Sequence, residues 1–232
     1  MEIGGTIISS VEYTGKIALV IFMAKCPLRC PYCHNSELLE NGEETTLEEL
    51  FKIIDDSADY IDAVVISGGE PLVHFKEVIE LLKYSKSLNL KTKIDTSGCY
   101  PEKLKKVLKF TDYIAIDIKV PFEKYKNIIG TDIGANVEKS MKLANNNSNT
   151  YLECRTTYVP ALLSHDDIKQ ISREIECDLY TLQQFRSKNV LDENLKGLES
   201  PNPHELKKLA YEIKPILNNV KIKTAEFGEE YI

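Results

Sequence analysis

Cys26-Pro-Leu-Arg-Cys30-Pro-Tyr-Cys33 places three cysteines within eight residues, in the pattern C-x3-C-x2-C. The stretch directly follows residues 17–22, an apolar run short enough to form a buried strand. The other cysteines are scattered: Cys99, Cys154 and Cys177. Such an uneven distribution, in a sequence with no export signal, indicates a metal site plus ordinary thiols rather than a disulfide framework. We therefore expect a reducing compartment and a cytoplasmic location.

The three cysteines are compatible with zinc or with iron–sulfur. Structural zinc takes four ligands in a closed tetrahedron, and the nearest fourth candidate, His34, is adjacent to Cys33 and poorly placed to complete it. A 4Fe-4S cluster normally takes four thiolates, so a set of three leaves one iron open to another ligand. The residues alone thus allow a zinc-stabilised scaffold, a ferredoxin-like carrier or an iron–sulfur enzyme.

Strand-like and helical segments alternate along the chain. Apolar runs predict strands at 6–13, 17–22, 63–66, 91–96, 113–118, 151–159 and 179–185, and capping signals and apolar spacing predict helices at about 46–58, 75–87, 101 onward, 134–146, 164 onward and 203–217. Such alternation implies right-handed crossovers and a parallel sheet covered by helices. Six units are too few for a closed eight-stranded barrel. We predict an α/β fold, a partial (βα)6 barrel with parallel strands.

The domain organisation follows from the same pattern. No Pro/Gly/Ser-rich linker divides the chain, so we expect one domain over residues 1–232. Its core should span about 15–186, followed by a C-terminal helix and strand at about 203–227.

Composition limits the partners. The formal net charge of −7 argues against general affinity for nucleic acid. The longest apolar run, residues 17–24, is far shorter than the roughly 20 residues that a membrane helix needs. We expect no nucleic acid and no membrane, and instead a small molecule or a protein partner.

Polar residues follow several predicted strands, at the edge of a parallel sheet where ligands gather. In Ser67-Gly-Gly-Glu-Pro71, glycines let backbone carbonyls approach an ammonium group closely. Asp95-Thr-Ser-Gly98 follows the next strand, and Asp117 and Lys119 follow the one after it. Arg155, on the fifth core strand, can hold a carboxylate in bidentate fashion. Each has a plainer reading as a turn, a cap or a structural ion pair.

The cysteine stretch, with the aromatic residue before Cys33 and the following His34-Asn35, resembles the signature of the radical S-adenosylmethionine (SAM) superfamily. The resemblance implies that Cys26, Cys30 and Cys33 hold a 4Fe-4S cluster. In that family the open iron chelates the amino and carboxylate groups of SAM, and an electron from the cluster breaks the sulfonium bond to give a 5′-deoxyadenosyl radical. Gly68, Gly69 and Glu70 match the family's GGEP motif, which implies contact with SAM.

Two further segments resemble those of glycyl-radical-enzyme activases. Asp95-Thr-Ser-Gly98 is similar to their D-T-N-G segment, with Ser97 in place of the usual Asn. There, the resemblance implies a monovalent cation held by Asp95, Thr96 and Asp117 beside the methionine carboxylate. Ile116-Asp-Ile-Lys119 is similar to L-D-L-K, which makes Lys119, together with Arg155, an expected contact of SAM.

The resemblance is closest to the activating proteins of anaerobic ribonucleoside-triphosphate reductase, and it covers residues 4–186. It implies a radical SAM oxidoreductase that places a glycyl radical on a partner enzyme and takes electrons from a flavodoxin- or ferredoxin-type donor. The first alternative is a small-molecule radical SAM enzyme similar to 7-carboxy-7-deazaguanine synthase. The second is a non-catalytic iron–sulfur or zinc protein.

Overall fold

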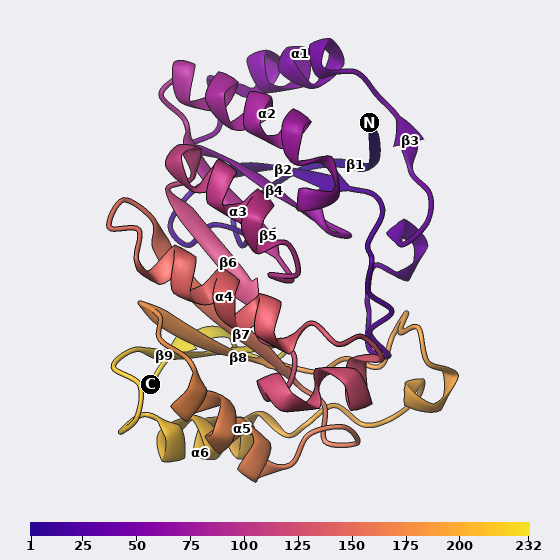
Figure 1. Ribbon diagram of the computed structural model, residues 1–232, viewed down its shortest axis with the longest axis vertical. Coiled ribbons are helices and arrows are strands. Elements are labelled where there is room, and N and C mark those ends of the chain that lie inside the picture. The colour runs from indigo at the N-terminus through magenta and orange to yellow at the C-terminus, as the bar shows by residue number, and fades with distance from the viewer.

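Strands from the whole length of the chain form a single sheet. A computed structural model describes residues 1–232. Ten strands form one sheet in the order β10-β9-β8-β7-β6-β5-β4-β2-β1-β3 (Figure 1). The strands are β1 (Glu2–Ser9), β2 (Ala18–Met23), β3 (Glu43–Glu44), β4 (Ala63–Gly68), β5 (Lys91–Thr96), β6 (Tyr113–Asp117), β7 (Tyr151–Tyr158), β8 (Leu179–Gln184), β9 (Val220–Thr224) and β10 (Gly228–Tyr231). β2 and β4 to β9 are parallel, whereas β1, β3 and β10 pair antiparallel at the two ends.

Helices cover the outer face of this sheet. They are α1 (Leu47–Ser57), α2 (Phe75–Ser87), α3 (Pro101–Val107), α4 (Gly134–Asn145), α5 (His165–Glu174) and α6 (Pro203–Ile213). Two of them begin at capping boxes, in which the side chain of Thr46 or Ser164 accepts a hydrogen bond from the amide of the third helical residue, and the carboxylate of that residue accepts one from the amide of Thr46 or Ser164. None of the helices is long and apolar enough to cross a membrane.

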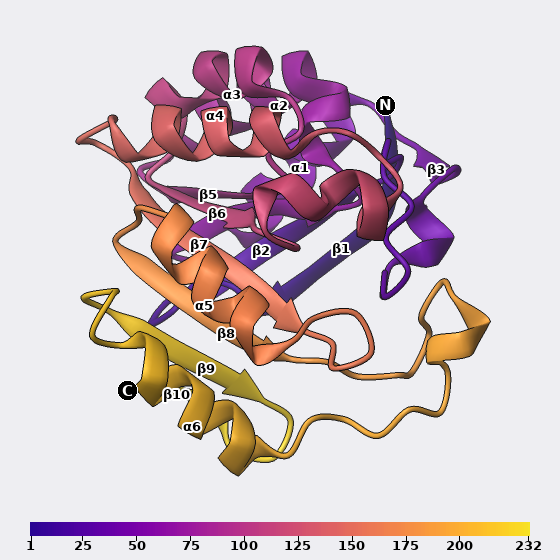
Figure 2. The same cartoon turned by 60° about the horizontal axis from the view of Figure 1, so that its bottom comes forward.

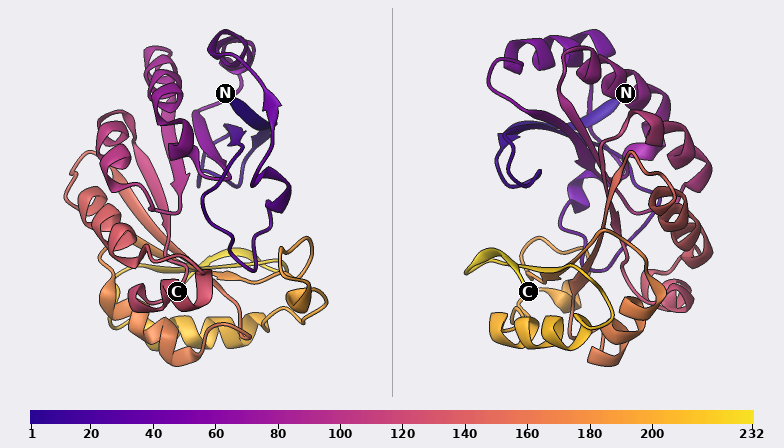
Figure 3. Two further views of the ribbon diagram at one scale, coloured as in Figure 1. Left: turned by 45° about the vertical axis from the view of Figure 1, so that its right-hand side comes forward. Right: turned by 90° about the vertical axis from the view of Figure 1, so that its left-hand side faces the viewer.

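The sheet curves strongly but stays open. Its first and last strands do not pair with each other, so a gap separates β1 from β9 and β10 (Figure 2). Helices lie on the convex side, and the concave side faces the gap (Figure 3). The prediction of an α/β fold with an incomplete parallel barrel is confirmed.

The strand inventory differs from the prediction at both ends. The first strand covers Glu2–Ser9 rather than 6–13, because the chain turns away into a loop after Ser9. The C-terminal strand is a hairpin, β9 with β10, and β9 adds a seventh parallel strand to the six expected. The polar sequence of β10, Gly-Glu-Glu-Tyr, gives no apolar signal because this strand forms an exposed sheet edge.

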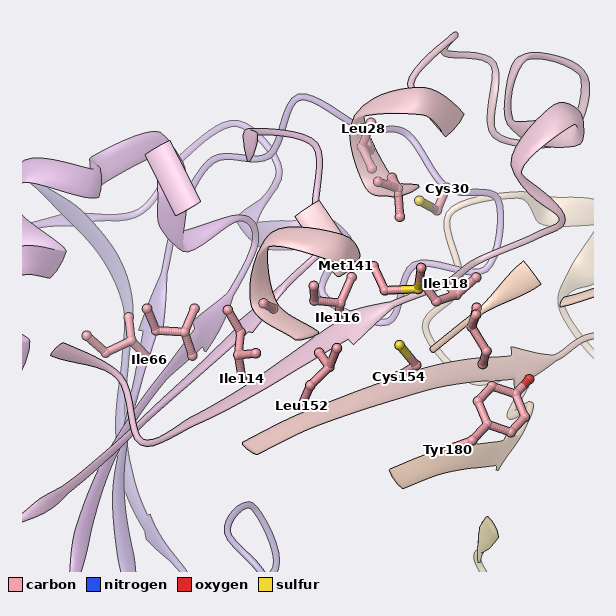
Figure 4. Packing of buried hydrophobic residues seen from close by; sticks show 14 of the residues in the cluster. Leu28, Cys30, Ile66, Ile114, Ile116, Ile118, Met141, Leu152, Cys154 and Tyr180 are labelled. Carbon is pink, nitrogen blue, oxygen red and sulfur yellow. The ribbon is translucent and has the colours of Figure 1, made fainter. Parts of the chain in front are cut away.

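Alternate residues of each strand face two different environments. On the helical side, Ile114, Ile116, Leu152 and Cys154 are fully buried and Met141 of α4 is nearly so (Figure 4). On the opposite face, Asp117, Glu153 and Arg155 are charged, whereas Ala115 is apolar. A second, small apolar cluster of Ala18, Val20, Ala63 and Val65 lies on the same face of β2 and β4. The main apolar core thus lies between sheet and helices, and the inner face combines charged residues with this small cluster.

Candidate functional site

The cysteine loop is anchored on both sides. It leaves β2 at Lys25, whose φ of 70° turns the chain sharply. The backbone amide of Lys25 donates to the carbonyl of Leu38 at 2.7 Å, and that of Cys26 donates to Leu39 at 3.2 Å. The amide of Cys33 donates a hydrogen bond to the carbonyl of Cys30 at 3.0 Å, which closes a turn within the loop. The loop is therefore fixed before any metal binds.

All three cysteines line one cavity of about 390 Å³. Their thiols are free, and burial raises their pKa values, that of Cys26 to about 12. Metal binding must therefore displace their protons, as is general for thiolate ligands. No group of three or more His, Cys, Asp or Glu side chains is gathered as the ligands of a single ion. Three thiols on the wall of one cavity supply the number of thiolates that a 4Fe-4S cluster with one open iron requires.

Gly68 and Gly69 bring the end of β4 against the cysteine loop. A Cβ atom on Gly69 would lie 2.5 Å from the carbonyl oxygen of Lys25, and one on Gly68 would lie 2.4 Å from that of Met23. Gly68 also has a φ of +110°, which side chains rarely tolerate. Both glycines line the cavity. Their first physical role is thus close packing of two backbone segments beside the cysteines.

Glu70 differs from the two glycines before it. Its side chain is fully buried and does not line the cavity. The carboxylate accepts hydrogen bonds from the hydroxyl and amide of Ser97, the hydroxyl of Thr96 and the amide of Leu72, at 2.5 to 3.0 Å. Every donor comes from the protein itself. Glu70 therefore ties the end of β4 to the end of β5, and no free carboxylate oxygen is left to face a ligand.

Asp95 and Asp117 end neighbouring strands and face the same guanidinium. Arg155 of β7 donates from Nη1 to Asp95 Oδ2 at 3.1 Å and from Nε to Asp117 Oδ1 at 2.9 Å. Burial favours the neutral acid, but the charges of Arg155 and Lys93 outweigh it and lower the pKa of Asp95 to about 2. The pKa of Asp117 is lowered in the same way, chiefly by Arg155 and Lys119 against the effect of burial.

Lys119 joins this group from the loop after β6. Its Nζ donates to Asp117 Oδ2 at 3.3 Å, while its backbone amide donates to the hydroxyl of the buried Tyr125 at 3.0 Å. Burial opposes the ammonium form, but the Asp117 carboxylate and nearby groups outweigh it and raise the pKa of Lys119. Lys93, behind the cavity wall, lies 3.2 Å from Asp95 and adds a third cation to the group. The charged side chains that line the cavity itself are balanced, Glu12, Asp95 and Asp117 against Lys119, Arg155 and Lys223, so it offers both donors and acceptors to a ligand.

The residues expected for a cation site are brought together only in part. The guanidinium of Arg155 already lies between the carboxylates of Asp95 and Asp117. The hydroxyl of Thr96 donates to Glu70 and accepts from the amide of Gly98 at 3.1 Å. Asp95 Oδ1 is a buried oxygen with no hydrogen-bond donor, although Lys93 Nζ lies 3.2 Å from it. Asp95 and Asp117 therefore both have cationic partners within the protein.

The cavity also has a wall that sequence reasoning missed. It is formed by Glu12 before β2, Thr157 of β7, Gln183 of β8 and Lys223 of β9. Thr157 and Gln183 lie two residues before the ends of predicted strands. The sequence shows that side chains alternate between the two faces of each strand, but not that these two side chains face the same cavity. Lys223 lies beyond the predicted core, on a strand that the chain brings back beside β8. These residues border the open side of the barrel.

The sequence has clear relatives. Residues 20–175 match the family model described as the Radical SAM superfamily. A protein of Methanocaldococcus jannaschii assigned to the glycyl-radical enzyme activating enzymes is 40% identical over 226 residues, which cover 94% of this chain and 93% of that protein. The pyruvate formate-lyase-activating enzyme of Clostridium pasteurianum is 32% identical over 220 residues, covering 87% of this chain and 92% of that enzyme.

The fold also resembles solved structures. SuiB of Streptococcus suis, bound to its precursor peptide SuiA, superposes with a TM-score of 0.68 at 19% identity. The match covers 88% of this chain and 48% of SuiB, so the chain spans about half the length of that protein. At this identity the likeness concerns the fold alone.

Proposed function

Since the chain belongs to the radical SAM superfamily and to its glycyl-radical enzyme activating enzymes, we propose that it generates a glycyl radical on anaerobic ribonucleoside-triphosphate reductase. Members of this family use a 4Fe-4S cluster and SAM. When bound, these groups supply a one-electron cleavage of SAM that yields a hydrogen-abstracting radical. The observation that carries the proposal is the cavity shared by the three cysteines, the Gly68–Gly69 turn and the charged group around Arg155.

Each part of the cavity has a proposed role in holding these groups. Cys26, Cys30 and Cys33 hold the cluster and leave one iron open. Gly68 and Gly69 let backbone reach the amino end of SAM, and Lys119 and Arg155 offer donors to its carboxylate. Asp95, Thr96 and Ser97 border the same place. Glu70 contributes indirectly, because its hydrogen bonds hold Thr96 and Ser97 in position.

The proposal includes a monovalent cation held at Asp95, Thr96 and Asp117. Asp95 Oδ1 has no hydrogen-bond donor but lies 3.2 Å from Lys93 Nζ, so a bound cation would take the place of that ammonium. Replacing potassium with the bulky tetramethylammonium ion should then slow SAM cleavage. An unchanged rate would mean that Arg155, Lys93 and Lys119 supply all the counter-charge that the carboxylates need.

The open side of the barrel suits a macromolecular substrate. The sheet does not close between β1 and the β9–β10 hairpin, and the loop after β1 spans part of this opening, where the hydroxyl of Thr14 donates to Glu229 at 3.4 Å. A loop of another protein can enter there, and Thr157, Gln183 and Lys223 offer it polar contacts. The protein's task is then to position one glycine Cα–H beside the bound SAM while it excludes water.

A second candidate partner has direct support. The Clostridium pasteurianum relative, which aligns with 87% of this chain, acts on pyruvate formate-lyase according to its name. Pyruvate formate-lyase is therefore the alternative substrate within the same class of reaction. A flavodoxin- or ferredoxin-type protein is the proposed electron donor for either partner.

The test uses the reconstituted, reduced protein with SAM and each candidate partner in turn. We expect a persistent glycyl radical, seen by electron paramagnetic resonance, on the ribonucleotide reductase and not on its variant with the target glycine replaced by alanine. A radical on pyruvate formate-lyase alone would assign that partner instead. Productive consumption of SAM with a free metabolite, and no radical on either enzyme, would overturn the activase proposal.

A further inference from the structure

A basic groove lies on the convex side of the protein, between α2 and α3. It measures about 820 Å³ and is lined by five exposed lysines and two glutamates together with Ile79 and Phe110: Lys76, Lys83, Lys105, Lys106, Lys109, Glu80 and Glu102. The glutamates are already paired, Glu80 with Lys83 at 2.8 Å and Glu102 with Lys139 of α4 at 2.7 Å. The groove is therefore positive in a chain whose net charge is −7.

The lysines of this groove have few internal partners. Neither Lys76 nor Lys105 forms an ion pair or lies over an aromatic ring, and Lys106 and Lys109 contact only the faces of Phe75 and Phe110, at 5.2 and 4.8 Å. Their positive charge is therefore uncompensated, which attracts negatively charged partners and speeds their association. The half-buried rings beneath them provide an apolar floor.

One end of the groove is connected to the cysteine loop. Lys103, beside the groove, lies over the rings of Tyr100 and Phe75 at 4.0 and 5.4 Å and donates to the carbonyl of Leu72 at 3.0 Å. Leu72 belongs to the 3-10 helix η2 (Pro71–His74), which precedes α2. His74 of η2 contacts the carbonyl of Ala24 at 3.2 Å, and the amide of Glu70 donates to Lys25 at 2.8 Å. Hydrogen bonds through residues 70–74 thus connect Lys103, beside the groove, to Lys25, the residue before Cys26.

We propose that this groove is the docking surface for a small acidic electron-carrier protein that reduces the cluster. The inference rests on the proposed function only in requiring a cluster that accepts one electron. In the transfer, the carrier loses one electron and is oxidised, the cluster gains it and is reduced, and no atom moves between them. The glycine-bearing partner must reach the concave side, whereas α2 and α3 lie on the convex side (Figure 3). The two partners can therefore be bound at once.

The test compares two charge-reversal pairs of equal net charge. Lys76→Glu with Lys105→Glu alters the groove without removing an ion pair, and Lys208→Glu with Lys214→Glu makes the same change on and just after α6. Cluster reduction is followed by visible bleaching in a stopped-flow instrument, with a photoreduced flavodoxin of negative net charge as the carrier. Dithionite serves as a reductant that needs no docking. Binding of the oxidised flavodoxin to the cluster-free chain is measured by calorimetry.

We expect the groove pair to slow reduction by flavodoxin on the order of tenfold or more at low salt and to weaken its binding to the cluster-free chain. The α6 pair should match the wild type, reduction by dithionite should be unchanged, and raised salt should remove the difference. Wild-type rates and affinity in the groove pair would overturn the proposal. Normal reduction combined with lost glycyl radical formation would also overturn it, in favour of an acidic segment of the glycyl radical enzyme.

These readouts separate the inference from the proposed function. Cluster reduction and flavodoxin binding are measured with no glycyl radical enzyme present. A failed activase proposal therefore leaves the docking result intact, and a failed docking result leaves radical formation with dithionite intact.

Discussion

The guanidinium of Arg155 on β7 reaches across β6 to the carboxylate of Asp95 on β5, with Nη1 3.1 Å from Oδ2. Asp117, on the intervening strand, shares the same guanidinium. β5, β6 and β7 are thereby tied together at the cavity wall. Because buried charges are tolerated only when paired, removal of one member of this group leaves another with less counter-charge.

Replacing Arg155 should therefore destabilise the protein. Arg155→Gln leaves the buried Asp95 and the part-buried Asp117 with only Lys93 and Lys119 as counter-charges, and we expect a loss of about 1.5–3 kcal/mol in the free energy of unfolding. Urea denaturation of the reconstituted protein under anaerobic conditions measures it. Lys142→Gln is the control, since Lys142 forms an exposed pair with Glu138 that should contribute less than about 0.5 kcal/mol. Equal losses in the two variants would contradict the role of Arg155.

The cysteine assignment predicts iron content. Anaerobic reconstitution should give about four irons per chain, as expected for one cubane cluster. Alanine at Cys26, Cys30 or Cys33 should abolish the cluster, because an iron loses its thiolate. Alanine at Cys99, Cys154 or Cys177 should leave it, and Cys99 and Cys154 are the most demanding controls because they are also buried. Full iron content in Cys30→Ala would refute the ligand set.

Close packing at Gly69 predicts a steric effect. In Gly69→Ala the new methyl would meet the carbonyl of Lys25 at 2.5 Å, so one backbone segment must move away from the other. We expect a loss of about 1–3 kcal/mol in unfolding free energy and faster loss of iron, because the shift reaches Cys26. The control is Gly15→Ala, whose new methyl group would have no atom within 4 Å. This variant should lose only about 1–2 kcal/mol through backbone strain and should retain its iron. Iron retention equal in both variants would count against this explanation.

The low pKa of Asp95 predicts a pH dependence of stability. Its pKa is about 2 in the folded chain and about 3.9 in an unfolded one, so the folded state binds fewer protons. This contribution, about 2–3 kcal/mol, is present in full above about pH 4 and is lost as the pH falls toward 2. Asp95→Asn should therefore flatten the stability curve of the cluster-free chain between about pH 4 and 2. Parallel curves for wild type and variant would show that Asp95 titrates normally.

Lys119 should contribute to the affinity for SAM. Lys119→Gln removes a cation from the cavity wall, and a hydrogen bond to a charged group is worth about 1.5–3 kcal/mol. We expect the dissociation constant of SAM to rise by about tenfold or more, measured by equilibrium dialysis on the reconstituted protein. The control is Lys126→Gln, which changes an exposed lysine of the π-helix η5 (Tyr125–Ile129) and should bind SAM as the wild type does. Identical affinities would remove Lys119 from the site.

Much of the fold is encoded locally. The capping boxes at Thr46 and Ser164 fixed two helix starts, and α2, β5 and β7 agree with their predicted bounds to within a residue. These features depend on residues a few positions apart, so a sequence displays them directly. The β9–β10 hairpin was missed in part because an exposed edge strand carries no apolar pattern.

The sequence by itself determined the cysteine spacing, the order of strands and helices, and the polar residues at strand ends. Only the tertiary structure decided how those residues use one another: Glu70 holds Thr96 and Ser97, and Arg155 neutralises Asp95 and Asp117. The physical reason is that spacing along a strand is a local property. Pairing between strand ends depends instead on sheet register and curvature, which bring together residues as far as 60 positions apart.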